Sequence, residues 1–477
     1  MAGLLGGLGV MPGDRVSVLT PNTELGLAAT FGVPWSGGVL NALNTRLSAN
    51  ELGYIVGHAG SRVMLADGEL ADLALEVAKL VDGPLEVIVD DGPDGEYESR
   101  LATAPPLRRE VEDELSLLSL NYTSGTTGRP KGVMYAHRGA YLQALAMATQ
   151  AGMDNDSVFL WTLPMFHCNG WCFPWAVTAV GGTHVTLRRV EPAAIWEAVE
   201  RHGVTHFNAA PTVLTGLVAA AAPAGRARDA GAPSGRGVLR VATGGAPPSP
   251  SLLSDLTALG IEVTHLYGLT ETYGPAVICD WRTEWNQLDD DQQAKLKARQ
   301  GVANVVSQPV RVVDDGRDVP ADGETMGEVV LRGNNVMLGY YRDPAATEAA
   351  SLDGWFRTGD LGVLHPDGYL ELRDRAKDVI ISGGENIASI EVEQALASHP
   401  AVLECAVVAA PDEKWGEVPV AYVTLRPDVD ATEAELIEHV KQVIARFKAP
   451  KRVEFGELPK TATGKIQKFA LRERVRP

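Results

Sequence analysis

Hydroxyl groups, glycines and one lysine are concentrated in the segment Tyr122–Val133, which reads Tyr-Thr-Ser-Gly-Thr-Thr-Gly-Arg-Pro-Lys-Gly-Val. Glycines let backbone N–H groups converge on an anion, and serine and threonine hydroxyls add further donors. Lys131 supplies a mobile positive charge. The largely apolar run Leu117–Leu120 just before it is typical of a buried strand. A strand that leads into such a loop predicts a phosphate-binding site suited to a nucleoside triphosphate.

The common P-loop motif, Gly-x-x-x-x-Gly-Lys-Ser/Thr, does not fit this segment. Pro130 stands where the second glycine of that motif should be, and Gly132 stands where its serine or threonine should be. The mismatch disfavours a P-loop kinase or ATPase. A plain surface turn is the remaining alternative for this segment taken alone.

A second segment has side chains that could take part in binding or catalysis. It is Tyr267–Glu271, Tyr-Gly-Leu-Thr-Glu, which follows the predicted strand Glu262–Leu266. An aromatic ring, a glycine, a hydroxyl and a carboxylate at the C-terminal end of one strand suit nucleotide binding. Three more segments combine glycines with charged or polar residues, namely Arg357–Asp360, Ile380–Asn386 and Pro459–Lys465.

In this order, the five segments resemble the motifs of the adenylate-forming, or AMP-binding, superfamily. That superfamily contains acyl-CoA synthetases, adenylation domains of peptide synthetases, and luciferases. The resemblance extends from Pro12 to Leu471. Within it, Phe166–Cys172 and Tyr267–Pro275 are similar to the acyl-CoA synthetase or fatty-acid–CoA ligase branch that acts on short- and medium-chain acids.

The resemblance implies a role for each nucleotide-binding residue. Tyr267 packs on adenine, Thr270 contacts the α-phosphate, and Glu271 holds Mg²⁺, for which one protein carboxylate suffices beside phosphate oxygens. Asp360 anchors the ribose, and Arg375 contacts the ribose or a phosphate. The remaining residues implied in ATP or AMP binding are Thr123, Ser124, Gly125, Thr126, Thr127, Gly128, Lys131, Gly245 and Ala246.

The same resemblance assigns the catalytic and CoA-binding residues. Lys465 matches the catalytic lysine, whose cation stabilises charge that develops between the carboxylate and the α-phosphate, and Thr270 and Glu271 complete the catalytic set. Lys377 matches the hinge about which the small domain turns. Gly383 and Gly384 match the loop along the pantetheine tunnel, where glycine lets the backbone approach a narrow ligand.

The acyl pocket is expected from two further segments. His167 is expected to face the carboxylate end of the acid, with a hydrogen-bonded core histidine as the alternative. Trp171 is large enough to cap a short tunnel, although it also suits ordinary core packing. Gly244, from Thr243–Ala246, is the third expected pocket residue.

The implied activity is that of an ATP-dependent acid–CoA ligase, with ATP, Mg²⁺ and coenzyme A. A fatty or other carboxylic acid, expected to be of short to medium chain, forms an acyl-adenylate and pyrophosphate, and the acyl group then passes to the CoA thiol. The alternatives are an adenylating enzyme with a carrier-protein or other acceptor, and an inactive, truncated nucleotide-binding protein. The presence of Glu271 and Lys465 disfavours the inactive form, because a protein that only binds a nucleotide needs neither residue.

Composition limits the other function classes. The chain has 477 residues with a net charge of -19, which disfavours nucleic-acid binding. Four scattered cysteines suggest no disulfide framework and no usual zinc pattern, which favours a reducing, cytoplasmic location. No apolar run is long enough to span a membrane. The segment from Lys448 to Arg476 has nine basic and three acidic residues, and suits either a solvated helix end or an anion-facing surface. A homodimer is possible.

Short strands alternate with helices along the chain, which predicts an α/β fold. Residues 1–374 are expected to form a large AMP-binding domain of mixed and parallel sheets flanked by helices. Residues 378–477 are expected to form a small mobile α+β domain beyond a hinge near 375–377, with the active site in the cleft between the domains. The family resemblance also implies that the first few dozen residues of the usual large domain are lacking.

The sequence also predicts individual elements. Further strands are expected at Arg15–Thr20, Val63–Ala66, Glu86–Asp90, Ser157–Trp161, Thr183–Leu187, Val204–Phe207, Val402–Ala410 and Val418–Leu425. Helices are expected at Ala194–Arg201 and Ser389–Ser398, and a capping box at Thr432 and Glu435. The helix after this box is expected to bury one stripe, formed by Leu436, Val440, Val443, Ile444 and Phe447. Ala219–Gly237 is expected to be a flexible surface insertion.

Overall fold

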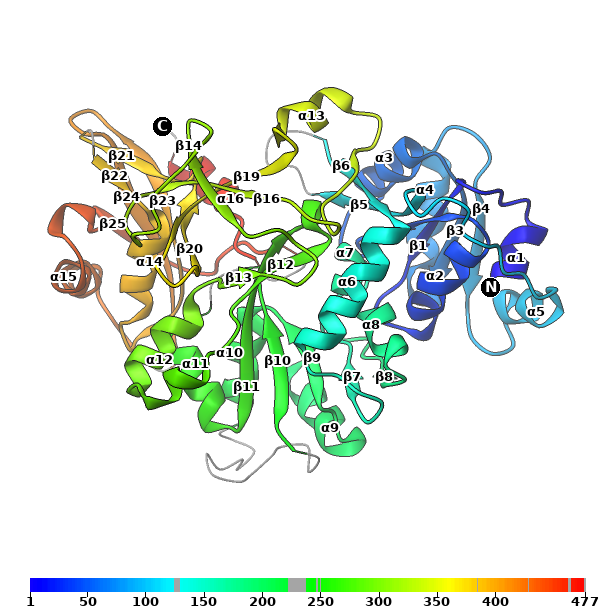
Figure 1. Cartoon of the computed structure of the whole chain (residues 1–477), viewed down its shortest axis with the longest axis horizontal. Helices are drawn as coiled ribbons and strands as arrows, with labels where there is room; N and C mark the ends of the chain where they lie inside the picture. The colour runs from blue at the N-terminus through cyan, green and yellow to red at the C-terminus, as the bar shows by residue number, and fades with distance from the viewer. Residues whose placement is uncertain are drawn as a thin grey trace.

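Four β-sheets follow one another along the described part of the chain in this computed structural model (Figure 1). The structure describes residues 1–123, 129–221, 237–245, 248, 250–383, 385–427, 429–461 and 465–475. In Figure 1 the first sheet lies at the right, the second in the lower centre, and the last at the left. This α/β arrangement of mixed and parallel sheets with flanking helices confirms the expected fold class.

The first sheet has seven strands in the order β17-β6-β5-β2-β1-β3-β4. Its strands are β1 (Arg15–Leu19), β2 (Val39–Ala42), β3 (Ser61–Asp67), β4 (Glu86–Asp90), β5 (Leu117–Thr123), β6 (Lys131–Ala136) and β17 (Gly339–Tyr340). The five strands β2, β1, β3, β4 and β5 are parallel, whereas β6 and β17 are antiparallel additions. The loop after β5 therefore leaves the sheet at the carboxyl end of parallel strands, where ligands bind in α/β folds.

The second sheet repeats this plan in the order β13-β12-β11-β10-β9-β7-β8. Its strands are β7 (Val158–Leu160), β8 (Thr183–Val185), β9 (His206–Ala209), β10 (Leu239–Thr243), β11 (Ile261–Leu269), β12 (Gly274–Ile278) and β13 (Val302–Ala303). Strands β7 to β11 are parallel, and β12 and β13 are antiparallel. The segment that continues β11 is the short helix η2 (Thr270–Thr272).

Two smaller sheets complete the molecule. The third contains β14 (Arg311–Asp314), β15 (Arg317–Asp318), β16 (Gly327–Leu331), β18 (Ser351–Leu352), β19 (Trp355–Leu364) and β20 (Leu370–Arg375). The fourth contains β21 (Ile380–Ser382), β22 (Glu385–Ile387), β23 (Val402–Asp412), β24 (Gly416–Leu425) and β25 (Arg452–Phe455). The chain passes from the third sheet to the fourth between Arg375 and Ile380.

Helices cover the sheets. Those of the first half are α1 (Ala2–Gly7), α2 (Glu24–Trp35), α3 (Ala49–Ala59), α4 (Ala71–Leu80), α5 (Glu96–Thr103), α6 (His137–Gln150), α7 (Cys168–Trp171) and α8 (Phe173–Ala179). Those of the second half are α9 (Pro192–His202), α10 (Pro211–Ala221), α11 (Pro250–Ala258), α12 (Asp290–Ala298), α13 (Pro344–Ala349), α14 (Ser389–Ala397), α15 (Glu433–Val443) and α16 (Lys468–Val475). Within the described residues, no helix combines the length and the apolar character needed to span a bilayer.

Each expected strand and helix is present, with ends that differ by a few residues. The Thr432–Glu435 capping box is confirmed, since Thr432 Oγ1 accepts from the Glu435 amide and Glu435 accepts from the Thr432 amide. The expected buried stripe is partly wrong, because α15 ends at Val443. Val443 is 52% exposed and Phe447 49% exposed. Helical spacing no longer determines which residues face the core once Ile444 adopts an extended backbone.

The expected surface insertion also begins later than predicted. Residues 219–221 belong to α10, whose buried members include Leu214, Leu217 and Ala221. Helix α10 therefore continues into the predicted insertion, because Ala221 is still part of the packed face. The predicted residues 222–236 lie outside the described part of the chain.

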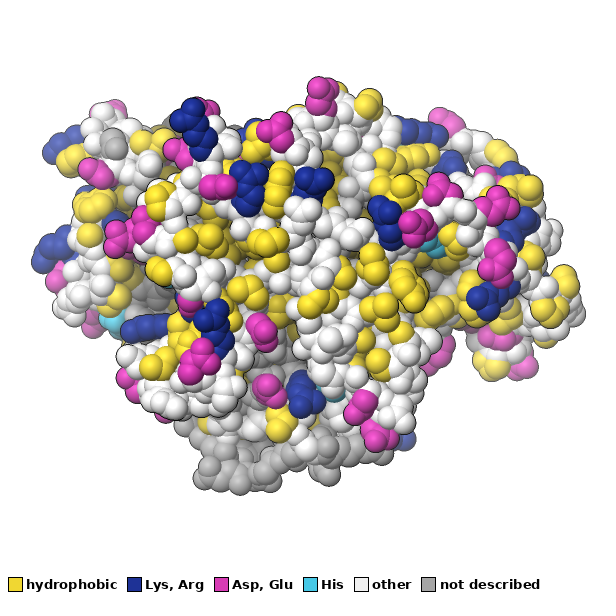
Figure 2. All heavy atoms as spheres, in the orientation of Figure 1, with side chains coloured by type: hydrophobic (Ala, Val, Ile, Leu, Met, Phe, Trp, Pro, Cys, Tyr) yellow, Lys and Arg dark blue, Asp and Glu magenta, His cyan; other side chains and the backbone are white. Residues whose placement is uncertain are grey.

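Charged side chains of both signs are mixed with apolar ones on the face shown in Figure 2. Several basic residues of the C-terminal segment are paired within the fourth sheet and its helices. Lys448 binds Glu391 at 2.7 Å, Lys460 binds Glu404 at 2.6 Å, Lys468 binds Glu393 at 2.7 Å, and Arg472 binds Asp378. A large part of this cationic segment is therefore used in internal ion pairs.

Candidate active site

The ends of the first two sheets meet at η2. Strand β5 contacts η2, and Tyr135 of β6 donates from Oη to the carbonyl oxygen of Thr270 at 2.5 Å. The Tyr135 ring stacks on Tyr273, with 3.7 Å between ring centroids. The phosphate-loop strand and the Thr270–Glu271 segment, distant in sequence, are thus held side by side.

A chain of contacts links Lys131 to Glu271 through a residue that the sequence did not indicate, Tyr340. Lys131 Nζ lies 4.8 Å from the centre of the Tyr340 ring, within the range of a cation–π interaction. Tyr340 Oη donates to Glu271 Oε1 at 2.8 Å. Burial, with the Glu271 carboxylate, raises the pKa of Tyr340, so its hydroxyl stays a donor. Tyr340 thereby connects the cation expected at phosphate with the carboxylate expected at Mg²⁺.

Glu271 suits Mg²⁺ by its chemistry and by its surroundings. It directly follows Thr270 in η2 and is connected to Lys131 through Tyr340, at the strand ends where a triphosphate is expected. Among the residues that the structure describes, no three His, Cys, Asp or Glu side chains are grouped as metal ligands. One carboxylate with phosphate oxygens and water is a usual Mg²⁺ environment, so the donor set fits this ion.

Asp360 of β19 is the centre of a second polar group. Its Oδ2 accepts from Tyr267 Oη at 2.7 Å, and its Oδ1 binds Arg375 Nε at 2.9 Å. Asp360 is 4% exposed and lies opposite Arg375 in the β19–β20 ladder. Burial, reinforced by the Asp360 carboxylate, raises the pKa of Tyr267 well above its usual value. The three residues predicted to hold adenine and ribose are therefore in direct contact.

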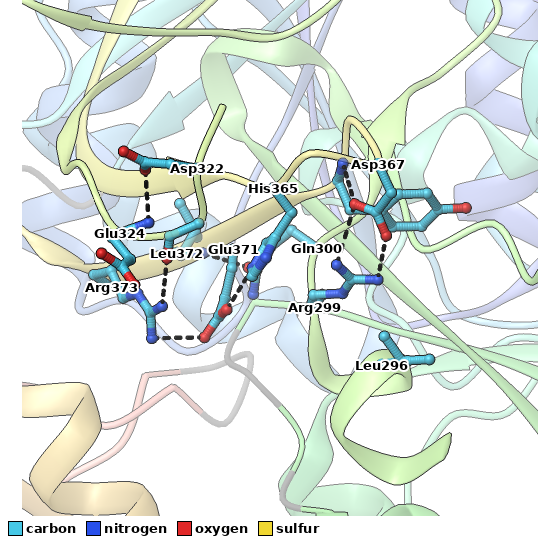
Figure 3. Close-up of polar contacts among 12 residues, drawn as sticks. Leu296, Arg299, Gln300, Asp322, Glu324, His365, Asp367, Glu371, Leu372 and Arg373 are labelled. Atoms are coloured by element: carbon cyan, nitrogen blue, oxygen red, sulfur yellow. Dashed lines mark hydrogen bonds and ion pairs between the residues drawn. The ribbon is translucent and has the colours of Figure 1, made fainter. Parts of the chain in front are cut away.

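The β19–β20 hairpin that carries Asp360 and Arg375 is braced at its far end (Figure 3). Arg299 donates to both carboxylate oxygens of Asp367, at 3.3 and 2.9 Å, and its guanidinium lies 4.8 Å from the centre of the Tyr369 ring. Gln300 Oε1 accepts from the Leu372 amide at 2.5 Å. These buried contacts fix the hairpin and hence the positions of its two site residues.

Lys465 reaches this group from the segment before α16. The residue is exposed by surface area, but its ammonium group lies among many surrounding protein atoms, and this burial is the main cause that lowers the pKa of Lys465 to about 8. The positive charges of Arg375, Lys468 and Lys377 lower the pKa further, and Asp360 opposes them. Crowding of cations around one lysine favours a site that binds an anion.

His167 lies within the electrostatic reach of Lys465. Burial, followed by the Lys465 charge, lowers the pKa of His167 to about 4, so the imidazole is neutral near pH 7. Cys168 Sγ lies 3.8 Å from His167 Nε2 and 3.7 Å from Thr270 Oγ1. The residue expected at the carboxylate end of the acid is therefore within electrostatic range of the expected catalytic lysine, and Cys168 connects it to the expected α-phosphate ligand.

We expect kcat/KM for adenylate formation to fall as the pH rises through about 8. Below this pH the Lys465 ammonium carries its proton and its charge, and above it the free enzyme loses both. Since kcat/KM reports groups of the free enzyme, pyrophosphate release at subsaturating ATP between pH 6 and 10 measures this limb. In Lys465→Arg the guanidinium stays charged, so the alkaline limb should disappear from any residual activity. Its persistence would assign the limb to another group.

The expected acyl segment contains an unusual backbone. Cys168, Asn169, Gly170, Trp171 and Cys172 have φ values of 43, 41, 56, 55 and 65°. This run is one turn of left-handed helix, a conformation that costs non-glycine residues about 1–2 kcal/mol each. All five residues are buried, so packing must hold the turn in place.

The Trp171 indole fits against two glycines. A Cβ atom on Gly274 would lie 2.9 Å from Trp171 Cδ1, and one on Gly244 would lie 3.3 Å from Trp171 Cη2. Trp171 is 7% exposed. The indole thus occupies the space over the end of β10 and the start of β12, where the acyl pocket is expected, and it lies close to Gly244.

Lys377 and Gly383 lie at the entry to the fourth sheet. Burial, followed by Arg375 and Arg472, lowers the pKa of Lys377. The Gly383 amide donates to the Trp415 carbonyl at 2.7 Å, and the neighbouring Ile381 is 55% exposed. Lys465 is within electrostatic range of Asp360 and Arg375, whereas the Gly383 amide is bonded to Trp415 within the small domain.

A buried network joins β20 to the helices after the predicted hinge. Asp374 accepts from the Ser389 amide at 2.5 Å and from Ser389 Oγ at 3.0 Å. Lys468 Nζ donates to Ser389 Oγ at 2.6 Å and binds Glu393 at 2.7 Å. Helix α14 thus begins at a carboxylate supplied by the preceding sheet.

Two further predicted site residues lie at strand ends. Thr123 ends β5, and Gly245 has a φ of 85° beyond the end of β10. The others lie outside the described residues, and they are Ser124, Gly125, Thr126, Thr127, Gly128, Ala246 and Gly384.

Two family profiles match the chain. The AMP-binding enzyme family matches residues 1–341, and the AMP-binding enzyme C-terminal domain matches residues 391–465. An acetate–CoA ligase of Humulus lupulus is 45% identical over 97% of this chain and 86% of its own. A peroxisomal acetate/butyrate–CoA ligase of Arabidopsis thaliana is 43% identical over 100% of this chain and 88% of its own.

A solved structure with the same fold is ATP-bound MatB from Rhodopseudomonas palustris. Its TM-score is 0.87 at 28% identity, over 99% of this chain and 92% of the other. The relatives, the family profiles and the fold agree with one another. The chain therefore belongs to the AMP-binding enzyme family and is an AMP-forming acyl-CoA synthetase, an acid–CoA ligase that uses ATP, Mg²⁺ and coenzyme A.

Proposed function

We propose that this synthetase activates a short- to medium-chain carboxylic acid, with its acyl chain ending against Trp171. The observation that supports the proposal is the packing of the indole against Gly244 and Gly274, in the turn that directly follows His167. An indole in this place leaves a short path for an acyl chain. The relatives named as acetate–CoA and acetate/butyrate–CoA ligases support the short end of this range.

The first half-reaction joins the acid to AMP. A carboxylate oxygen of the acid bonds to the α-phosphorus of ATP, and the bond from that phosphorus to the bridging oxygen of pyrophosphate breaks. Lys465 and Thr270 stabilise the negative charge between the reacting groups. Lys131, with the loop after Thr123, holds the β- and γ-phosphates, and positioning accounts for most of the acceleration in such reactions.

The nucleoside and the metal are held by the residues already in contact with one another. Asp360 and Arg375 bind the ribose, and Tyr267 packs on adenine while its hydroxyl stays on Asp360. Mg²⁺, when bound at Glu271, neutralises phosphate charge. Tyr340 keeps the Glu271 carboxylate oriented by its 2.8 Å hydrogen bond.

The second half-reaction requires a different arrangement of the same parts. The small domain rotates about Lys377, so that Lys465 leaves and the loop of Gly383 and Gly384 approaches the adenylate. The CoA thiolate sulfur then bonds to the acyl carbon, and AMP leaves with the carboxyl–phosphate oxygen. Supporting this proposal, Lys465 is near Asp360 and Arg375 in the structure, whereas Ile381 beside the glycine loop is exposed.

We also propose that the chain divides into residues 1–374 and 378–477. Supporting this division, residues of β21, β23, β24, α14 and α15 pack into a separate apolar core that includes Ile380, Val392 and Leu436. A cytoplasmic location and a homodimer stay predictions from the sequence.

Replacement of Trp171 by alanine should shift substrate preference toward longer acids. The indole would no longer fill the space over Gly244 and Gly274, and each additional buried methylene changes selectivity by about 1 kcal/mol or more. We expect the ratio of kcat/KM for hexanoate to that for acetate to rise roughly tenfold or more. An unchanged ratio would remove Trp171 from the pocket. Leu145→Ala, at an exposed position of α6, is the control variant.

Carboxylate-dependent pyrophosphate release with Mg·ATP, measured over acids of two to twelve carbons with and without CoA, tests the proposed function. Turnover that needs one size class of acid and accelerates with CoA supports it. Turnover that accelerates only with a phosphopantetheinyl carrier protein would favour the alternative acceptor. An absence of release with every acid would contradict the proposal and favour an inactive nucleotide-binding protein.

A further inference from the structure

The left-handed turn Cys168–Cys172 needs an external support. Four of its five residues carry a Cβ atom and adopt positive φ values, which L-residues avoid because Cβ approaches the carbonyl oxygen. Consecutive residues in this region persist only where surrounding structure holds them, and such sites concentrate at active sites. Because His167 directly precedes the turn and Trp171 lies within it, the support of the turn also sets the position of both side chains.

The side chain of Asn169 supplies this support. Its Oδ1 accepts from Ser119 Oγ at 2.5 Å, from Tyr273 Oη at 2.9 Å and from Asn121 Nδ2 at 3.3 Å. Its backbone amide donates to Asn121 Oδ1 at 2.9 Å. Asn169 is fully buried, and its Nδ2 has no hydrogen-bond partner among the described residues. One amide oxygen therefore makes the side-chain contacts that hold the middle of the turn.

The partners of Asn169 belong to the nucleotide site. Ser119 and Asn121 lie on β5, the strand that leads into the phosphate loop. Tyr273 follows η2 and stacks on Tyr135, whose hydroxyl binds the carbonyl of Thr270. The hydrogen bonds of Asn169 thus connect the expected acyl segment to the two segments that are expected to hold triphosphate and metal.

We propose that Asn169 is a positioning residue that aligns the acid with the nucleotide. Its Oδ1 fixes the left-handed turn against β5 and Tyr273, so that His167 and Trp171 present the acid at a set depth beside Thr270. This inference rests on the proposed acyl pocket and adds a determinant of acid selectivity that touches neither substrate. A displaced turn misplaces the carboxylate relative to the α-phosphate, and displacements of this kind have large effects on rate.

Two substitutions separate the side-chain contacts from the backbone conformation. Asn169→Gly keeps the freedom to adopt positive φ and removes Oδ1. Asn169→Asp keeps an oxygen acceptor of the same shape, tolerates the left-handed region, and lacks the unpartnered Nδ2. The matched control is Asp315→Gly, an exposed residue with a φ of 46° outside the site.

Acid-dependent pyrophosphate release by the full chain gives the readout. For Asn169→Gly we expect KM for the preferred acid to rise by about 10-fold and the preference between acids of different length to flatten, with KM for ATP nearly unchanged. In KM for the acid and in acid preference, Asn169→Asp should stay closer to the wild type than Asn169→Gly. Asp315→Gly should match the wild type in both. Wild-type selectivity in Asn169→Gly would overturn the inference. An equal rise in KM for all acids and for ATP would also overturn it.

The wild-type acid profile distinguishes a failure of the proposed function from a failure of the role of Asn169. If the wild type releases pyrophosphate with no acid, the proposed function fails. If the wild type is selective and Asn169→Gly keeps that selectivity, the role of Asn169 alone fails. Should Asn169→Gly not fold, Tyr273→Phe removes one donor to Oδ1 and keeps the ring that stacks on Tyr135. It should shift the acid preference in the same direction, and an unshifted preference would contradict the inference.

Discussion

Replacement of Lys465 by alanine should reduce adenylate formation by about 10²–10³-fold, the usual cost of removing a group that stabilises developing charge. The surroundings of Lys465 explain this expectation. Its ammonium lies near Asp360, Arg375 and His167, where the ribose, the α-phosphate and the carboxylate are proposed to meet. In the proposed second half-reaction Lys465 has left the site. CoA-dependent thioester formation from supplied acyl-adenylate should therefore be nearly unaffected.

The comparison of the two half-reactions is the decisive measurement for Lys465. Pyrophosphate release reports the first step, and thioester formation from synthetic acyl-adenylate reports the second. Lys460→Ala is a matched control, because Lys460 belongs to the same segment but pairs with Glu404 at 2.6 Å. Equal losses in both steps would contradict the assigned role.

Replacement of Asp360 by alanine should raise KM for ATP by roughly 100-fold, since two ribose hydroxyls would each lose a hydrogen bond to a charged acceptor, at about 1.5 kcal/mol apiece. The same change leaves Arg375 without its 2.9 Å partner and the buried Tyr267 hydroxyl without its acceptor. The free energy of unfolding should therefore fall as well. Initial rates over a range of ATP concentrations measure the first effect, and thermal unfolding with and without ATP measures the second.

Two variants give the Asp360 prediction its controls. Asp360→Asn keeps the volume of the side chain but removes the charge, so it should show the binding loss with less destabilisation. Asp318→Ala removes a carboxylate from the same sheet, where Asp318 pairs with Arg311 at 2.6 Å and is 63% exposed. An unchanged KM for ATP in Asp360→Ala would remove Asp360 from the ribose site.

Much of the site was predictable because its chemistry follows strand ends. Thr123 and Tyr267–Glu271 follow predicted strands, and parallel strands bring their carboxyl ends to one edge of a sheet. Tyr340 was not predictable in this way. It lies on a two-residue strand that pairs with β6, about two hundred residues earlier in the chain. Neither its type nor its spacing indicates a contact with Glu271.

Other parts of the fold depend on long-range packing in a similar way. The left-handed turn is unfavourable for each of its non-glycine residues, and contacts with β5 and Tyr273 override that local preference. The antiparallel third sheet was not predicted, and its strands β14, β15 and β18 are too short to give a periodic pattern. The buried stripe predicted on α15 was partly wrong for a different reason. The apolar residues continue at helical spacing in the sequence past Val443, where the helix ends.

The Asp374–Ser389 contact has a consequence for the order in which the substrates act. Because Asp374 precedes the predicted hinge and Ser389 follows it, the proposed rotation at Lys377 would uncap α14. Loss of a helix cap costs about 1 kcal/mol, which corresponds to roughly a fivefold bias toward the arrangement seen here. We therefore expect the resting enzyme to favour the arrangement that accepts ATP and the acid, and CoA to bind to a minor population with an apparent affinity that is lower by that fraction. We expect sequential use of the site, with CoA engaging after pyrophosphate has departed.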